Sequence, residues 1–71
     1  MTSQEIVERT CHVADRIAGS LGIQFDGGYA DAGVSDPCAK TEIGKIWHAA
    51  RIATIHWTGE DPNEHYQKLK L

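Results

Sequence analysis

The sequence has few cysteines, which cross-link small secreted domains, and no long apolar run, which would anchor a protein in a membrane. It has two cysteines in 71 residues, and its N-terminus, MTSQEIVER, lacks the basic and then apolar order of an export signal. We therefore expect no disulfide framework. No stretch approaches the roughly 18 consecutive apolar residues of a membrane span. These absences predict a cytoplasmic protein with reduced thiols.

Positive charge is also scarce. Seven Lys and Arg residues stand against ten Asp and Glu residues, for a formal net charge of −3. Domains that bind nucleic acids usually carry a basic stripe or arm, whereas acids and bases are interspersed in this chain and only residues 68–71 are locally basic. The charge pattern therefore argues against a nucleic acid as the partner.

Large apolar side chains are few, and the chain is short. At 71 residues, the burial of one core exceeds the entropy cost of folding by a thin margin. We expect residues 1–71 to form one small helical domain, and we expect association with another chain to supplement its stability.

The first helix has start and stop signals. Thr2 and Glu5 match a capping box, in which each side chain accepts a hydrogen bond from the other residue's amide. Apolar residues then recur at helical spacing as far as Leu21. Gly22 fits a glycine C-cap, and Ile23 fits the apolar residue that folds back on it. The pattern predicts a helix that ends at Leu21.

Residues 22–35 form a glycine-rich connection, because they hold four of the seven glycines and show no helical period. The segment Asp26-Gly27-Gly28 has good turn chemistry. It lies between Phe25 and Tyr29, which would anchor the connection. The connection could therefore contain a small hairpin.

Two Asp-Pro pairs are typical of helix starts, with the aspartate as N-cap and the proline in the first turn. After Asp36-Pro37, a long helix could run to Thr58 or begin again at Thr41, and Gly59 stops it. Asp61-Pro62 starts a short C-terminal helix. The expected fold is all-α, with two main helices, a short C-terminal helix and the glycine-rich connection.

The central helix has two apolar faces. At about 100° per residue, a broad stripe suited to the core contains Ile43, Ile46, Trp47, Ala50, Ala53 and Trp57. The opposite side carries Ala49, Ile52 and Ile55, flanked by His48 and His56. In a small monomer, a helix face exposed to solvent normally carries charged side chains. We therefore expect a partner to cover this side.

The two histidines would meet in a symmetric dimer. Antiparallel packing of two copies centred on Ile52 places His48 of one chain beside His56 of the other. Such a pair would make the interface sensitive to pH or open to metal bridging. A metal-binding or metal-sensing protein that uses His48 and His56, with Cys38 or His65, is therefore one alternative function.

Catalysis is not predicted, because neither Cys11 nor Cys38 has the sequence around it that marks a nucleophile. We expect a small non-enzymatic accessory protein, without a cofactor, that forms a homodimer and modulates or inhibits a larger protein. Phages and mobile elements use proteins of this size and composition. A second alternative is a small subunit of a larger enzyme complex. The predicted interface consists of His48, Ala49, Ile52, Ile55, His56 and Trp57.

Overall fold

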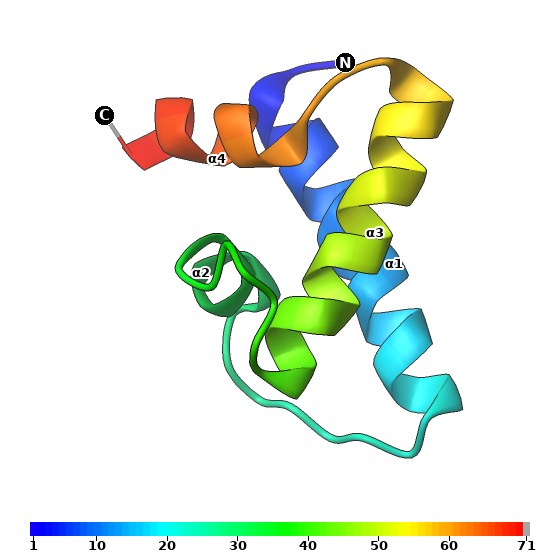
Figure 1. Cartoon of the computed structure of the whole chain (residues 1–71). Helices are drawn as coiled ribbons and strands as arrows, with labels where there is room; N and C mark the ends of the chain where they lie inside the picture. The colour runs from blue at the N-terminus through cyan, green and yellow to red at the C-terminus, as the bar shows by residue number, and fades with distance from the viewer. Residues whose placement is uncertain (71) are drawn as a thin grey trace.

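Four α-helices joined by loops make up the computed structural model, which describes residues 1–70 (Figure 1). The helices are α1 (Ser3–Ser20), α2 (Tyr29–Val34), α3 (Glu42–Thr58) and α4 (Pro62–Lys70). No strand occurs in residues 1–70, so the expected all-α class is confirmed. None of the helices described is both long and apolar enough to cross a bilayer.

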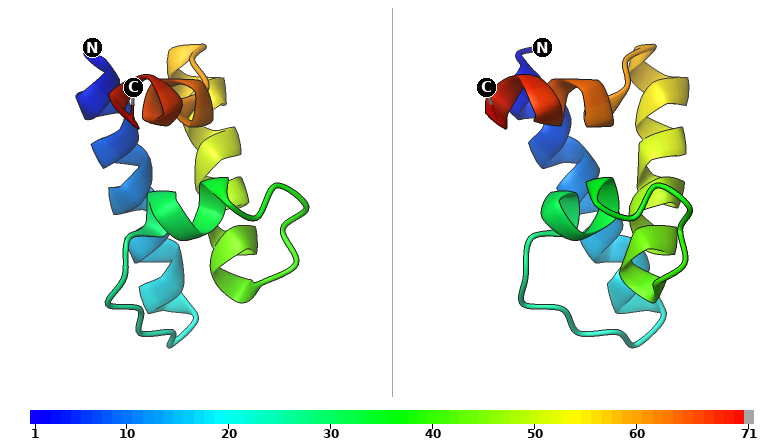
Figure 2. Two further views of the ribbon diagram at one scale, coloured as in Figure 1. Left: turned by 90° about the vertical axis from the view of Figure 1, so that its left-hand side faces the viewer. Right: turned by 60° about the vertical axis from the view of Figure 1, so that its left-hand side comes forward.

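The four helices form two layers. Helices α1 and α3 lie side by side and run in opposite directions (Figure 1). Helices α2 and α4 both pack on the same side of this pair, α2 toward the end of α1 and α4 toward its start (Figure 2). Within residues 1–70, no helix covers the opposite side of the pair.

Both ends of α1 match the sequence prediction. The Thr2 side chain accepts a hydrogen bond from the Glu5 amide at 3.2 Å, and the Glu5 carboxylate accepts one from the Thr2 amide at 3.0 Å. At the other end Gly22 has a φ of +73°, which favours glycine. The Ile23 amide donates to the Ala18 carbonyl at 2.9 Å, which completes a Schellman motif.

The hairpin considered for the glycine-rich connection is not present. Tyr29–Val34 forms the short helix α2 instead. The expected anchors do pack there: the rings of Phe25 and Tyr29 meet edge to face with centroids 5.2 Å apart, and Tyr29 is buried. The sequence does not predict α2, because six residues with an internal glycine carry too weak a pattern and tertiary packing supplies the stability of the helix.

Of the two starts considered for the central helix, the later one is correct. Helix α3 begins at Glu42, and its N-cap is Thr41, whose hydroxyl accepts from the Gly44 amide at 2.9 Å. Asp36 does not cap a helix that starts at Pro37. Its carboxylate closes the preceding loop by accepting from the Lys40 and Thr41 amides and the Thr41 hydroxyl. These bonds, led by the Thr41 amide, hold the pKa of Asp36 below its usual range.

Helix α4 begins at Pro62, as predicted, and Asp61 has two roles at its start. Its carboxylate accepts from the Asn63 amide at 2.9 Å, as an N-cap does. It also forms a two-pronged ion pair with Arg51 of α3, with N···O distances of 2.9 and 2.7 Å. The hydrogen bond from Arg51 holds the pKa of Asp61 below its usual range.

Trp47 is the largest fully buried side chain, and it joins three helices. It projects from α3 against Gly33 of α2, where a Cβ atom would overlap the indole. Its indole N–H donates to the Asn63 side chain of α4 at 2.8 Å. The remaining buried apolar residues of the core are Ile6, Val7, Ala14, Ala18, Tyr29, Ala30, Ile46 and Ala50.

One polar contact lies inside the α1–α3 interface. The hydroxyls of Thr10 and Thr54 are 2.8 Å apart, and both residues are buried. Each hydroxyl also lies within hydrogen-bond distance of a carbonyl four residues back, 2.9 Å to Ile6 and 3.0 Å to Ala50. The hydroxyl pair therefore meets its hydrogen-bonding needs without water.

Replacement of Gly33 tests the close packing of α2 on Trp47. We expect Gly33→Ala to destabilise the protein by about 1–3 kcal/mol, because the new methyl group overlaps a buried indole that has no room to move. Gly19→Ala is the matched control. No atom from elsewhere in the chain lies within 4 Å of the position that a Cβ would take at Gly19, so the change should stabilise helix α1 by about 0.5–1 kcal/mol. Urea unfolding of both variants measures the difference, and equal effects would contradict this packing.

The Arg51–Asp61 pair should make stability depend on pH. Because the pKa of Asp61 is lowered in the folded protein, the pair stabilises above the ordinary aspartate pKa and is lost as pH falls through the lowered value. Asp61→Asn keeps a capping oxygen and removes the charge. At pH 7 we expect it to cost up to about 1 kcal/mol. Thermal unfolding should show this gap closing as pH falls below about 4, and a gap independent of pH would contradict the ion pair.

Candidate functional site

Three exposed large hydrophobic side chains, Ile52, Ile55 and Trp57, lie on α3. We call the surface that they form with their neighbours the outer face of α3 and define it as His48, Ala49, Ile52, Ala53, Ile55, His56 and Trp57, all of which are exposed. Among them Ile52 is 55% and Trp57 58% exposed. Single exposed hydrophobic residues are common on protein surfaces and need no explanation. These residues lie next to one another on one helix, so they form a patch that does call for one.

The outer face of α3 carries no permanently charged side chain. Residues 46–58 include a single Lys, Arg, Asp or Glu, which is Arg51. Arg51 lies at the edge of this face, one turn from His48 and Ile55, and its guanidinium is half-buried in the ion pair with Asp61. A helix surface exposed to water usually carries charge, so this face has the composition of a contact surface.

The structure corrects the predicted core stripe of α3 at two positions. Ala53 and Trp57 are exposed, and Thr54 is buried in their place. Trp57 lies at the end of the outer face, and the guanidinium carbon of Arg9 on α1 lies 3.4 Å from the centroid of its ring. This cation–π contact holds the indole across the α1–α3 seam rather than inside it.

The metal hypothesis gains no ligand set from a single copy of the chain. In residues 1–70, no three His, Cys, Asp or Glu side chains come together in a way that could hold a metal ion. His48 and His56 are both exposed, two turns apart on α3. Cys38 is exposed in the loop before α3. His65 is committed to other contacts, with its two ring nitrogens 2.7 Å from the Ser3 hydroxyl and 3.0 Å from the Glu60 carboxylate.

Cys11 packs against the core as a structural thiol. It is half-buried beside the apolar cluster, and burial raises the pKa of its thiol above the ordinary value. A raised pKa leaves less thiolate, which is the reactive form. Its surroundings therefore favour packing over nucleophilic chemistry.

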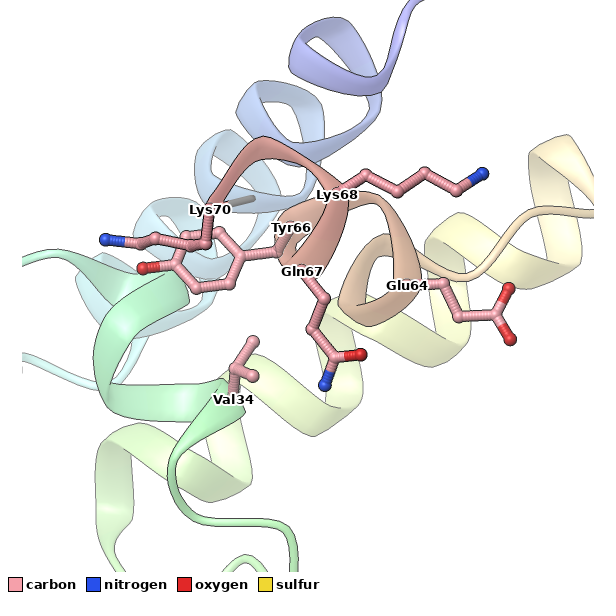
Figure 3. A pocket seen from close by; sticks show the side chains of 6 residues that line it. All are labelled: Val34, Glu64, Tyr66, Gln67, Lys68 and Lys70. Carbon is pink, nitrogen blue, oxygen red and sulfur yellow. The ribbon is translucent and has the colours of Figure 1, made fainter.

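A shallow groove of about 590 Å³ lies between α4 and the end of α2 (Figure 3). Val34 and the Tyr66 ring form its apolar part, and the Tyr66 hydroxyl is buried without a hydrogen-bond partner among the described residues. Lys70 bridges its rim, 5.3 Å from the Tyr66 ring centroid and 3.5 Å from Asp31. Glu64 and Lys68 extend away from Val34 (Figure 3), so the groove lacks the convergent polar groups of a specific ligand site.

Comparison of the chain with protein-family models, with curated proteins and with solved structures finds no match in any of the three.

The two tryptophans should respond differently to the same substitution. Trp47→Phe leaves the half-buried Asn63 oxygen without its donor and opens a gap beside the core, and we expect a loss of about 1–3 kcal/mol. Trp57→Phe should change stability by less than about 0.5 kcal/mol, because the residue is on the surface. Acrylamide quenching gives an independent measurement. The fluorescence of Trp57, alone in the first variant, should be quenched readily, and that of Trp47, alone in the second, should be shielded. Equal quenching would contradict the assigned burial.

Proposed function

We propose that this chain is a small cytoplasmic protein-binding protein that forms a homodimer through the outer face of α3 and, as a dimer, modulates a larger protein. The observation that carries the proposal is the uncharged apolar surface between His48 and Trp57, with Ile52 55% exposed at its centre. An apolar surface of this kind on a small domain is typical of a protein interface.

A second copy of the chain fits this surface for a physical reason. Symmetric contacts bring each patch against itself, so a charged patch would repel its own copy. The seven residues of the outer face of α3 carry no permanent charge, and the exposed Lys45 lies one turn before Ala49, outside the patch. Two copies centred on Ile52 therefore bring no like charges together within the patch. Ala49 and Ala53 flank Ile52 along the helix, and small side chains allow two helices to approach closely around a larger one.

An antiparallel crossing at Ile52 arranges the rest of the interface. His48 of each copy then lies beside His56 of the other, which provides polar partners at both ends of an apolar centre. This arrangement also gives a place for metal bridging between copies, although the monomer has no ligand cluster in residues 1–70.

The larger partner would contact the two ends of the dimer. Trp57 and Arg9 are stacked at the end of the outer face, with Trp57 58% exposed. Tryptophan and arginine are the residue types most enriched among those that dominate binding energy. We therefore assign the Arg9–Trp57 pair to recognition of the larger protein, and Ile52 to self-association.

The dimer can be tested with one charge. We expect Ile52→Asp to convert dimer to monomer, because an unpaired carboxylate in an apolar interface costs several kcal/mol, on the order of 3–5. Analytical ultracentrifugation measures the association state of both proteins. A wild-type monomer at high micromolar concentration would refute the dimer, as would a variant that stays dimeric.

Leu69→Asp is the matched control. Leu69 is 50% exposed, close to the 55% of Ile52, but it lies on α4 outside the outer face of α3. The control should remain dimeric. Addition of zinc to the same samples separates an apolar interface from a metal-bridged one. Tightening that is lost in His48→Gln/His56→Gln would indicate a metal bridge.

A further inference from the structure

We propose that Ser3, His65 and Glu60 form a nucleophilic site that cleaves small carboxylic esters. The three side chains come from the start of α1, from α4 and from the turn between α3 and α4. They form one continuous chain of contacts: Ser3 Oγ lies 2.7 Å from His65 Nδ1, and His65 Nε2 lies 3.0 Å from Glu60 Oε1. A hydroxyl, an imidazole and a carboxylate in this order are the parts of a serine nucleophile with its base.

The carboxylate determines the direction of these hydrogen bonds. An ionised Glu60 can only accept, so Nε2 of His65 must carry the ring proton that it donates. In the neutral imidazole Nδ1 is then the acceptor, and the Ser3 hydroxyl donates to it. His65 is therefore oriented as a general base for Ser3, and Glu60 is a positioning residue. The His65 side chain is 12% exposed, which shields the pair from water, whereas that of Glu60 is 49% exposed.

The start of α1 supplies hydrogen-bond donors beside the nucleophile. The first bond within the helix region runs from the Ile6 amide to the Thr2 carbonyl, and the capping box occupies the amides of Thr2 and Glu5. The amides of Ser3 and Gln4 precede that first bond and so have no acceptor within α1. They can stabilise an oxyanion formed next to Ser3, as backbone amides do in serine hydrolases.

A hollow of about 280 Å³ begins at Glu60, the outer member of the three residues. It is lined by Met1, Ile6, Trp57, Thr58 and Glu60. Ile6 follows Ser3 by one turn on the same side of α1, and Glu60 belongs both to the hollow and to the hydrogen-bonded chain. Met1, Ile6 and Trp57 give the hollow an apolar part, Thr58 and Glu60 give it a polar part, and its small volume suits the acyl group of a short-chain ester.

The reaction balances with water as the only co-reactant. Ser3 Oγ attacks the ester carbonyl carbon while His65 Nδ1 takes the hydroxyl proton. The carbon–oxygen bond to the alcohol breaks, and the alcohol leaves with that proton. Water then attacks the acyl group on Ser3 and gives a proton to Nδ1. The carboxylic acid leaves, and the proton returns to Ser3.

Hydrolysis of p-nitrophenyl acetate by the full chain tests the site. We expect Ser3→Ala and His65→Gln each to lower kcat/KM by about 100-fold or more, the size of a general-base contribution. Glu60→Gln should lower kcat more than it changes KM, because it removes the charge that orients His65 and keeps nearly the same shape where Glu60 lines the hollow. His12→Gln is the control for hydrolysis by surface imidazole and should match the wild type.

Mass spectrometry after a short reaction locates the acyl group. An acetyl group on Ser3 in the wild type, absent from Ser3→Ala, supports the proposal. Wild-type hydrolysis no faster than that of Ser3→Ala, or acetylation elsewhere only, would overturn it. Circular dichroism and thermal unfolding of each variant show whether the fold is kept, since the Ser3–His65 contact also joins α4 to α1.

A variant that unfolds more easily yet hydrolyses the ester at the wild-type rate would assign these residues a structural role alone. Ser3, His65 and Glu60 lie outside the outer face of α3, but Trp57 belongs both to that face and to the hollow. The hydrolysis assay of Ile52→Asp therefore separates the two proposals: an active monomer shows that the site does not need the dimer.

Discussion

The packing of Trp47 is the interaction on which the other helices depend. Helices α2 and α4 are too short to be stable alone, and both attach to this one side chain, α2 through the close approach of Gly33 and α4 through the hydrogen bond to Asn63. The Arg51–Asp61 pair, one turn further along α3, reinforces the second attachment. Because Trp47 draws both short helices to one side of the α1–α3 pair, the outer face of α3 is left without cover.

Features decided by neighbours in the sequence were predictable. Three examples are the capping box at Thr2, the C-cap at Gly22 and the start of α4 at Pro62. Each of these features depends only on residues that lie within five positions of one another. The same holds for the two apolar faces of α3, since helical periodicity alone places Ile52 opposite Trp47. The side on which Ile52 lies is exposed.

Features decided by the tertiary structure were not predictable. Aspartate before proline is typical of an N-cap, but the Asp36 carboxylate accepts three hydrogen bonds from Lys40 and Thr41. These three bonds stabilise the loop more than a single capping bond would stabilise a helix that starts at Pro37. Trp57 fits the core stripe by periodicity, yet Thr54 takes the buried position in the α1–α3 interface, where its hydroxyl meets that of Thr10. Ser3 and His65 are 62 positions apart, and no spacing rule joins a hydroxyl and an imidazole at that distance.

The Thr10–Thr54 contact has a consequence for how the two long helices hold their alignment. Each hydroxyl has one proton and two acceptors in reach: the carbonyl four residues back in its own helix, Ile6 or Ala50, and the oxygen of the other hydroxyl. Either threonine can therefore donate across the seam while the other donates within its own helix, and the two patterns are equivalent. Sliding α3 along α1 by one turn would abolish both patterns at once. The Thr10–Thr54 contact therefore opposes sliding of α3 along α1. The two hydroxyl protons still have two arrangements open to them, so the helices are aligned without the hydroxyl groups losing all of their rotational entropy.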